Sequence, residues 1–164
     1  NCGNPPLGKF VKQSIYLPDE AATESLAREI VDALPEDISG WIVLLQGDLG
    51  AGKSTLARGM IRAFGYEDSV PSPTYTLIEP YEIQDNLIYH VDLYRISSLD
   101  ELQYLGWKDL EDGLCIIEWP ERVPGLSARA DIIVSLGYEA AARVAEIRSL
   151  SDRGADIIVR LNLK

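Results

Sequence analysis

The sequence contains little that would place this protein in a membrane or in a disulfide-rich class. No apolar run approaches the roughly 18 residues of a membrane-spanning helix, and the 164 residues include only two cysteines. Cys2 stands in a Pro/Gly-containing lead and Cys115 in an apolar run. We expect a mobile thiol and a buried side chain there rather than a disulfide or a metal site. The N-terminus also lacks a charged-then-apolar signal segment. These features favour a cytoplasmic protein.

Basic residues are scarce. The chain has 15 Lys and Arg against 26 Asp and Glu, which gives a formal net charge of −11. Direct binding to DNA or RNA depends on cations that neutralise phosphates, so this balance disfavours it. It also disfavours docking on anionic membranes. An acidic surface instead suits a protein partner that presents a basic face.

Against this background, one glycine-rich stretch stands out. An apolar run at 41–46 reads as a buried strand, and the segment 55–64 has the apolar spacing of a helix. Between them lies Gly47-Asp48-Leu49-Gly50-Ala51-Gly52-Lys53-Ser54. This is the G-x-x-x-x-G-K-[ST] pattern in its required strand-to-helix context, so it predicts a P-loop that binds nucleotide phosphates. Lys53 would contact the β- and γ-phosphates, and the Ser54 hydroxyl would face Mg²⁺.

The remaining pattern predicts an α/β protein. We expect a P-loop NTPase-like three-layer fold with a mixed parallel and antiparallel sheet, as one P-loop ATPase domain over 14–164, after a disordered lead at 1–13. The expected helices lie at 18–34, 55–64 and 99–105. The expected strands are 14–17, 41–46, 74–79, 87–92, 114–117, 132–136, 142–147 and 156–161, the last three forming an antiparallel meander.

Two acids are candidates for completing a magnesium site. Glu118 ends the apolar strand at 114–117, and Asp92 ends the strand at 87–92. A buried strand delivers its terminal side chain to the sheet edge where nucleotides bind, and P-loop proteins use an acid there to hold Mg²⁺. The plainer alternative for either acid is a solvated strand end or an ion pair.

Other polar residues are open to two interpretations. Thr74 and Thr76 lie in a proline-framed stretch that could act as a switch sensing the γ-phosphate, or they could be ordinary strand threonines facing solvent. His90 is the only histidine, and a single histidine on a strand is more often structural than catalytic. Arg95 could stabilise a transition state or pair with one of the many acids.

The nucleotide is expected to be ATP. GTPases resemble one another in an Asn-Lys-x-Asp motif and an Asp-x-x-Gly motif after the P-loop. This chain has no Asn-Lys pair, and its Asp-x-x-Gly, from Asp37 to Gly40, precedes the P-loop. The helix start near Asp19–Thr23 is a weak candidate for the base pocket.

Four motifs, in this order, resemble the bacterial TsaE (YjeE) ATPase family of tRNA threonylcarbamoyladenosine (t6A) biosynthesis. Besides the P-loop they are Ser72-Pro73-Thr74-Tyr75-Thr76-Leu77, Tyr89-His90-Val91-Asp92-Leu93-Tyr94-Arg95 and Ile117-Glu118-Trp119-Pro120-Glu121. The stretch 17–23 also matches, and the resemblance covers roughly residues 14–150. Two departures are small. The family often has Thr where Ser54 stands, and Glu121-Arg122-Val123, after Trp119-Pro120, is a variable region from which no role is carried over.

This resemblance implies a slow ATPase that works with two partner proteins. In the family, those partners transfer threonylcarbamoyl to adenosine 37 of tRNA, and the ATPase supports their repeated cycles, meeting tRNA only indirectly. The family's magnesium ligands correspond to Ser54 and Glu118, with Asp92 in the acidic set, and Lys53, Asp92 and Glu118 would serve catalysis. The implied ATP-binding set is Thr23, Asp48, Leu49, Gly50, Ala51, Gly52, Lys53, Ser54, Thr55 and Arg143.

Two other functional classes stay open from the sequence. One is a binding module gated by nucleotide, in which hydrolysis is incidental. The other is a small-molecule P-loop kinase. A kinase usually needs an arginine-bearing lid, and arginine is sparse between Gly65 and Gly113.

Overall fold

The computed structural model describes residues 10–104 and 106–163. The strands are β1 (Lys12–Leu17), β2 (Ile42–Gly47), β3 (Ile78–Ile83), β4 (Asn86–Asp92), β5 (Leu114–Glu118), β6 (Ile132–Glu139) and β7 (Ala142–Ser149). The α-helices are α1 (Glu20–Ala33), α2 (Lys53–Ala63), α3 (Leu99–Tyr104) and α4 (Asp152–Ile158). Short 3₁₀ helices are η1 (Trp107–Asp112), η2 (Pro120–Arg122) and η3 (Leu126–Arg129).

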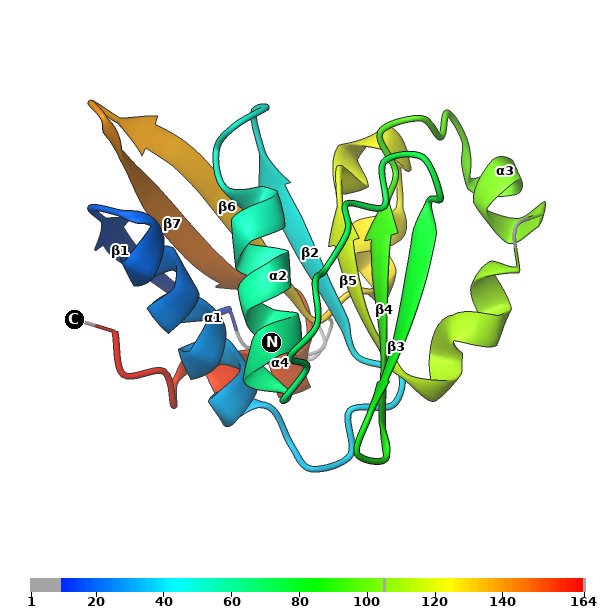
Figure 1. The fold of residues 1–164 in the computed structure, drawn as a ribbon, viewed down its shortest axis with the longest axis horizontal. Coiled ribbons are helices and arrows are strands. Elements are labelled where there is room, and N and C mark those ends of the chain that lie inside the picture. The colour runs from blue at the N-terminus through cyan, green and yellow to red at the C-terminus, as the bar shows by residue number, and fades with distance from the viewer. Residues whose placement is uncertain (1–9, 105, 164) are drawn as a thin grey trace, which may run out of the picture.

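The described strands form one mixed sheet in the order β1-β7-β6-β2-β5-β4-β3. The pairs β2–β6, β2–β5 and β4–β5 are parallel, and the outer pairs are antiparallel. The prediction of an α/β fold with a mixed sheet is therefore confirmed. Because β2, β4 and β5 run in the same direction, their carboxyl ends meet at one edge, which lies at the top in Figure 1.

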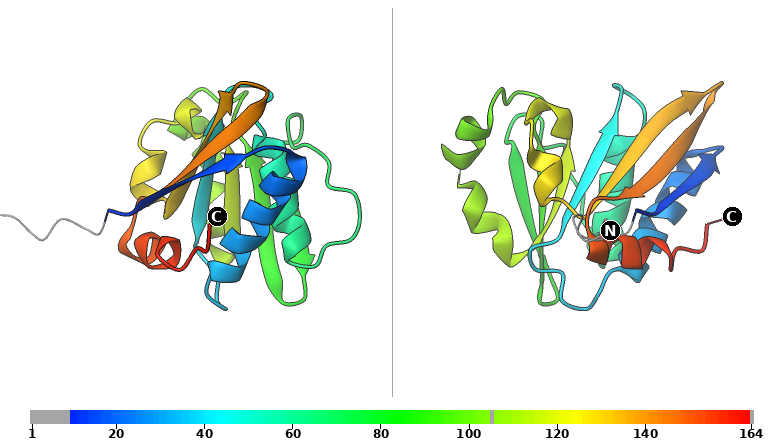
Figure 2. Two further views of the ribbon diagram at one scale, coloured as in Figure 1. Left: turned by 90° about the vertical axis from the view of Figure 1, so that its left-hand side faces the viewer. Right: turned by 180° about the vertical axis from the view of Figure 1, so that it is seen from behind.

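Each face of the sheet is covered by different elements. The amphipathic helices α1 and α2 lie side by side on one face and bury apolar residues such as Leu26, Ile30, Leu56 and Met60. On the other face, seen from behind in Figure 2, η1 and η3 contribute Leu110 and Leu126 to a second apolar cluster. The helix α4 packs against β7 and α1, at the end of the sheet opposite the P-loop. This burial holds the P-loop edge on a rigid base.

The strand predicted at 74–79 begins too early. Residues 74–76 form a turn, residue 77 is a bend, and β3 begins at Ile78. Leu77 has a positive φ of 70° and its N–H donates to the Pro73 carbonyl, so the chain bends before it enters the sheet. β3 then passes through Pro80, which is tolerated because β3 is an edge strand.

The strand predicted at 156–161 is wrong, because helix α4 extends through Ile158 and a turn follows it. Ser151 caps this helix by accepting a hydrogen bond from the Gly154 N–H. The apolar pair Ile157 and Ile158 packs into the core from the helix. The predicted meander therefore contains only β6 and β7, and β7 pairs next with β1.

The N-terminal sheet strand is longer than predicted. β1 begins at Lys12, whose register partner on β7 is Arg148, so the last two residues of the predicted lead belong to the sheet. Residues 1–9, including Cys2, lie outside the described residues. The remaining predicted elements match described helices and strands within a few residues, apart from residue 105, which is outside the described range.

Candidate nucleotide-binding site

The glycine-rich stretch forms a tight loop between the end of β2 and the start of α2. Gly47 lies so close to β6 that a Cβ there would sit 2.6 Å from the Leu136 carbonyl oxygen. Gly52 caps α2 with a φ of 111°, a conformation that favours glycine. The sequence thus folds into a loop followed at once by a helix N-terminus, the arrangement that binds phosphate groups.

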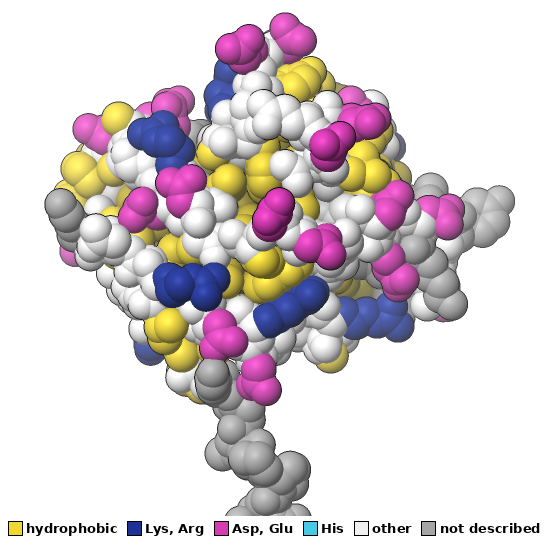
Figure 3. All heavy atoms as spheres, turned by 90° about the horizontal axis from the view of Figure 1, so that it is seen from below, with side chains coloured by type: hydrophobic (Ala, Val, Ile, Leu, Met, Phe, Trp, Pro, Cys, Tyr) yellow, Lys and Arg dark blue, Asp and Glu magenta, His cyan; other side chains and the backbone are white. Residues whose placement is uncertain are grey.

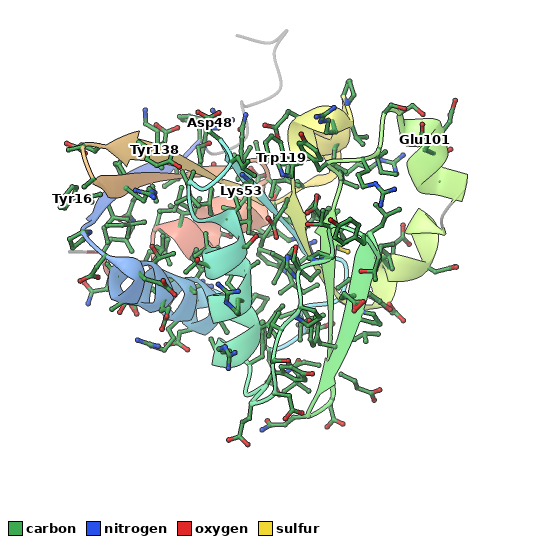
Figure 4. All side chains as sticks on the ribbon, turned by 45° about the horizontal axis from the view of Figure 1, so that its top comes forward. Tyr16, Asp48, Lys53, Glu101, Trp119 and Tyr138 are labelled. Atoms are coloured by element: carbon green, nitrogen blue, oxygen red, sulfur yellow. The ribbon has the colours of Figure 1, made fainter. Side chains whose placement is uncertain are left out.

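Side chains from three elements hold the carbonyl groups of this loop. Lys53 Nζ donates to the carbonyls of Gly47 and Asp48 at 2.5 and 3.0 Å. Across the loop, the Tyr138 hydroxyl donates to the Leu49 carbonyl, and Arg143 Nη2 donates to that of Gly50. Figure 4 shows Tyr138 beside the loop that carries Asp48.

Lys53 is nearly buried, with 4% of its surface exposed. Its ammonium lies 4.2 Å from the centroid of the Trp119 ring, which it faces in Figure 4. Burial lowers the pKa of Lys53, although the nearby carboxylates, Glu118 first among them, act in the opposite direction. The ammonium therefore provides a concentrated positive charge in a partly dehydrated position, where it interacts strongly with anions.

Trp119 has an unusual backbone. Its φ of 59° and ψ of 48° place a large non-glycine residue in the left-handed region, directly after Glu118. Its ring also packs edge-on against Tyr94, with 4.9 Å between ring centroids. Strained residues of this kind concentrate at functional sites, since only a well-packed surrounding holds them in place.

The two predicted acids lie next to each other. Asp92 and Glu118 are register partners at the ends of the parallel strands β4 and β5, and both are buried. Glu118 Oε1 accepts a hydrogen bond from Ser54 Oγ at 3.0 Å. Asp92 accepts from the Tyr94 N–H at 2.9 Å and from Thr74 Oγ1 at 3.3 Å. The arrangement brings the predicted metal-binding residues Ser54, Asp92 and Glu118 together.

These oxygens suit a magnesium ion. Hydroxyl and carboxylate oxygens are the hard donors that Mg²⁺ prefers, and this metal usually has few protein ligands beside waters and phosphate oxygens. Among the described residues, no group of three or more His, Cys, Asp and Glu is arranged to hold a metal by itself. The donor set therefore fits a metal shared with a phosphate ligand.

Two adjoining pockets border the loop. The first, of about 210 Å³, contains most of the predicted phosphate and metal residues; it is lined by Leu49, Gly50, Gly52, Lys53, Ser54, Thr55, Thr74, Asp92, Glu118 and Trp119. The second, of about 360 Å³, shares Gly50, Gly52 and Thr55 with it and adds the predicted Thr23 and Arg143. Thr23 lies on α1 and Arg143 on β7, so residues of β1, α1, α2 and β7 line the second pocket.

One predicted residue lies outside the site, and two residues that lie in it were not predicted. Thr76 is exposed and does not line either pocket, whereas Thr74 does. Tyr138 was missed because its approach to the loop depends on the β6–β7 register, which pairs it with Arg143. No role in the site was predicted for Trp119, although its position directly after Glu118 is a signal that could have indicated one.

The surface away from the site mixes both charges. The face seen from below in Figure 3 carries both basic and acidic side chains, and the basic ones form no continuous area among the residues drawn in colour. In the part of the chain that the structure covers, no helix is long and apolar enough to cross a bilayer.

Comparison with known proteins agrees with this geometry. The family described as "Threonylcarbamoyl adenosine biosynthesis protein TsaE" matches residues 17–145. A tRNA threonylcarbamoyladenosine biosynthesis protein TsaE from Haemophilus influenzae is 40% identical over 147 residues, covering 87% of this chain and 93% of its own. The protein of the same name from Synechocystis is 39% identical over 119 residues, covering 70% of this chain and 74% of its own.

The fold also has a match among solved structures. The crystal structure of Bacillus subtilis YdiB superposes with a TM-score of 0.72 at 21% sequence identity, covering 96% of this chain and 97% of that one. At that identity the likeness concerns the fold alone. The extent of the family match, together with relatives near 40% identity over most of their length, shows that this chain belongs to the TsaE family.

Proposed function

We propose that this protein is a magnesium-dependent ATPase that supports t6A modification of tRNA. It would hydrolyse ATP slowly and drive repeated cycles of a partner complex that transfers threonylcarbamoyl. Membership of the TsaE family and the printed names of its relatives support the pathway. The observation that carries the ATPase role is the P-loop in which Ser54, at the start of α2, is hydrogen-bonded to the buried Glu118.

The proposed roles follow from the positions of the side chains. Lys53 and the loop N–H groups would hold the β- and γ-phosphates. Ser54, Glu118 and Asp92 would hold Mg²⁺, which when bound neutralises charge on the transferred phosphoryl group. Asp92 would also orient the attacking water, since its carboxylate lies at the sheet edge beside Glu118. Thr74, through its hydrogen bond to Asp92, would shift when the γ-phosphate is lost.

The base and ribose of ATP would occupy the larger pocket. Thr23 and Arg143 line it together with the loop residues that it shares with the phosphate pocket. Arg143 is held there by its bond to the Gly50 carbonyl and by stacking over Tyr138, 4.1 Å from the ring centroid. Thr76, exposed on the same proline-framed loop as Thr74, is proposed to act with it as part of the switch.

The partners would be proteins of the t6A-synthesising complex, and tRNA would be met only through them. The net charge of −11 supports this, because direct RNA binding would need a basic surface. We also place the protein in the cytoplasm, where the free thiol of buried Cys115 is stable. That residues 14–164 form a single ATPase domain remains a prediction.

A gate that responds to nucleotide without needing hydrolysis is the second candidate. The link between Thr74 and Asp92 favours it, because nucleotide occupancy alone could move the Thr74 loop. The two functions differ in one respect: an ATPase cycle requires turnover, whereas a gate requires only binding.

Separate Glu118→Ala and Asp92→Ala variants would distinguish the two. The measurement is multiple-turnover t6A formation with purified partner proteins and tRNA, alongside ATP hydrolysis and nucleotide affinity. Glu82→Ala, which removes an exposed acid from β3, is the matched control. We expect each site variant to keep nucleotide binding and lose hydrolysis and repeated t6A formation. Full t6A formation without hydrolysis would favour the gate.

A further inference from the structure

His90 is a buried polar residue that the proposed mechanism does not use. It lies in the middle of β4 with 1% of its surface exposed, opposite Ile116 of β5. Its neighbours on the same face of the strand are Ile88 and Asp92, since side chains alternate along a strand. Ile88 and Ile116 belong to the apolar cluster beneath α1 and α2, so His90 lies between that core and the phosphate pocket.

The imidazole makes one short contact. His90 Nε2 lies 2.6 Å from Glu118 Oε2, and both side chains are almost completely buried. An ionised carboxylate can only accept hydrogen bonds, so with Glu118 ionised the proton in this contact belongs to Nε2. The other ring nitrogen, Nδ1, is buried without a hydrogen-bond partner among the described residues. Among the described residues, Glu118 is thus the hydrogen-bond partner of the imidazole ring.

The two oxygens of Glu118 are therefore divided between two partners. Oε2 is held from below by His90, and Oε1 accepts from Ser54 Oγ at the start of α2. A carboxylate fixed through one oxygen cannot rotate without breaking that contact, so the second oxygen keeps its direction. His90 thereby determines which oxygen of Glu118 is presented to the P-loop.

We propose that His90 is a positioning residue for the nucleotide-bound metal: its Nε2–H fixes Glu118 so that Oε1 is presented beside Ser54. This inference rests on the proposed function, because it assumes that Glu118 holds Mg²⁺ with ATP. Loss of a partner that orients a metal-binding carboxylate typically lowers metal affinity by about 10- to 100-fold. A purely structural histidine would contribute to stability and leave metal affinity unchanged.

Two substitutions separate these roles. His90→Leu keeps an apolar side chain of moderate size and removes the donor, whereas His90→Gln keeps an N–H that can reach Glu118. The measurement is Mn²⁺ affinity in the presence of ADP, followed by electron paramagnetic resonance, with ADP affinity in chelator and the melting temperature as references. We expect His90→Leu to weaken Mn²⁺ binding about 10- to 100-fold, and His90→Gln, which keeps a donor, to bind Mn²⁺ more tightly than His90→Leu does. ADP affinity in chelator should be unchanged.

The outcomes are distinct. Equal Mn²⁺ affinity in His90→Leu and the original protein, with only the melting temperature lowered, would overturn the positioning role and leave the proposed function intact. Equal loss in both variants would also overturn it, because the donor would then be irrelevant. Absence of any Mn²⁺–ADP binding by the unaltered protein would instead reject the proposed function, and the inference with it.

A spectroscopic measurement tests the hydrogen bond itself. His90 is the only histidine in the chain, so its imidazole nitrogens give a single set of signals in a long-range ¹H–¹⁵N spectrum. We expect Nε2 to carry a proton, with a signal that moves when Mg²⁺ and ADP are added together. A bare Nε2, with the proton on Nδ1 alone, would contradict the proposal.

Discussion

Glu118 illustrates what can be derived for a single residue from the chain. Its position after the apolar run 114–117 predicted a buried acid at the sheet edge, and its side chain is 3% exposed. Its contact with His90 could not be derived, because it depends on which strands are neighbours and in which register. The same holds for Tyr138, whose hydroxyl reaches the Leu49 carbonyl from a hairpin far along the chain.

Arg143 gives a residue-scale prediction. Its guanidinium holds the Gly50 carbonyl and lines the larger pocket, so Arg143→Ala should weaken ATP binding about tenfold, the equivalent of roughly 1.4 kcal/mol. Tyr138→Phe, which removes only the hydroxyl bond to Leu49, should have a smaller effect. Isothermal titration calorimetry measures both, and Arg148→Ala on the same strand is the control. Unchanged affinity in Arg143→Ala would remove this residue from the site.

Among the elements, those with long periodic patterns were the most predictable. Helix α1 follows from its apolar stripe, with Asp19 as the N-cap that accepts a hydrogen bond from Ala22. The short segment 156–161 was misjudged because a run of apolar residues does not by itself distinguish a buried helix from a strand. The Ser151 cap was the signal that should have decided it.

The contact between α1 and α2 gives an element-scale prediction. Gly59 of α2 lies against Ala27 of α1, and a Cβ at position 59 would sit 2.8 Å from the Ala27 Cβ. Overpacking by Gly59→Ala should lower the free energy of unfolding by about 1–3 kcal/mol. The higher helix propensity of alanine should offset about 1 kcal/mol of that loss.

The matching Ala27→Gly change makes a double-mutant cycle. Adding it to Gly59→Ala relieves the collision, so the double variant should be more stable than the sum of the two single effects. Denaturant unfolding of all four proteins gives the coupling free energy. Additive effects would show that the helices are not in close contact at this point.

For the molecule as a whole, the sheet order could not be predicted from the sequence. The P-loop and the class of fold were readable, because glycine spacing and apolar runs are local signals. Strand order is set by which buried faces pack together. Here β5 lies between β2 and β4, although 66 residues separate the end of β2 from the start of β5 in the chain. That insertion brings Asp92 and Glu118 together.

Alkaline conditions test the burial of Cys115, which lies in the second apolar cluster. Burial raises the pKa of the Cys115 thiol from 9.0 to about 12. Between these values the unfolded chain has lost the proton that the folded protein retains, so the free energy of unfolding falls as pH rises, by at most about 1.4 kcal/mol per pH unit from this group. The lowered pKa of Lys53 acts in the opposite sense, since folding is favoured there as the ammonium loses its proton.

Urea unfolding at intervals from neutral to alkaline pH measures this slope. The Cys115→Ala variant lacks the thiol and should show a shallower fall in the free energy of unfolding above the ordinary pKa of cysteine. Lys53→Ala should show a steeper fall, because the opposing contribution is gone. Parallel curves for Cys115→Ala and the original protein would mean that the thiol is accessible to water.

The central claim is that the P-loop edge binds and hydrolyses ATP for the t6A-synthesising partners. The most direct test is ATP turnover by the purified chain, alone and with those partners plus tRNA, with Lys53→Ala as the control. We predict turnover that is slow alone, rises with the partners and disappears in Lys53→Ala. Turnover that the partners leave unchanged, or phosphoryl transfer to an added metabolite, would contradict the account.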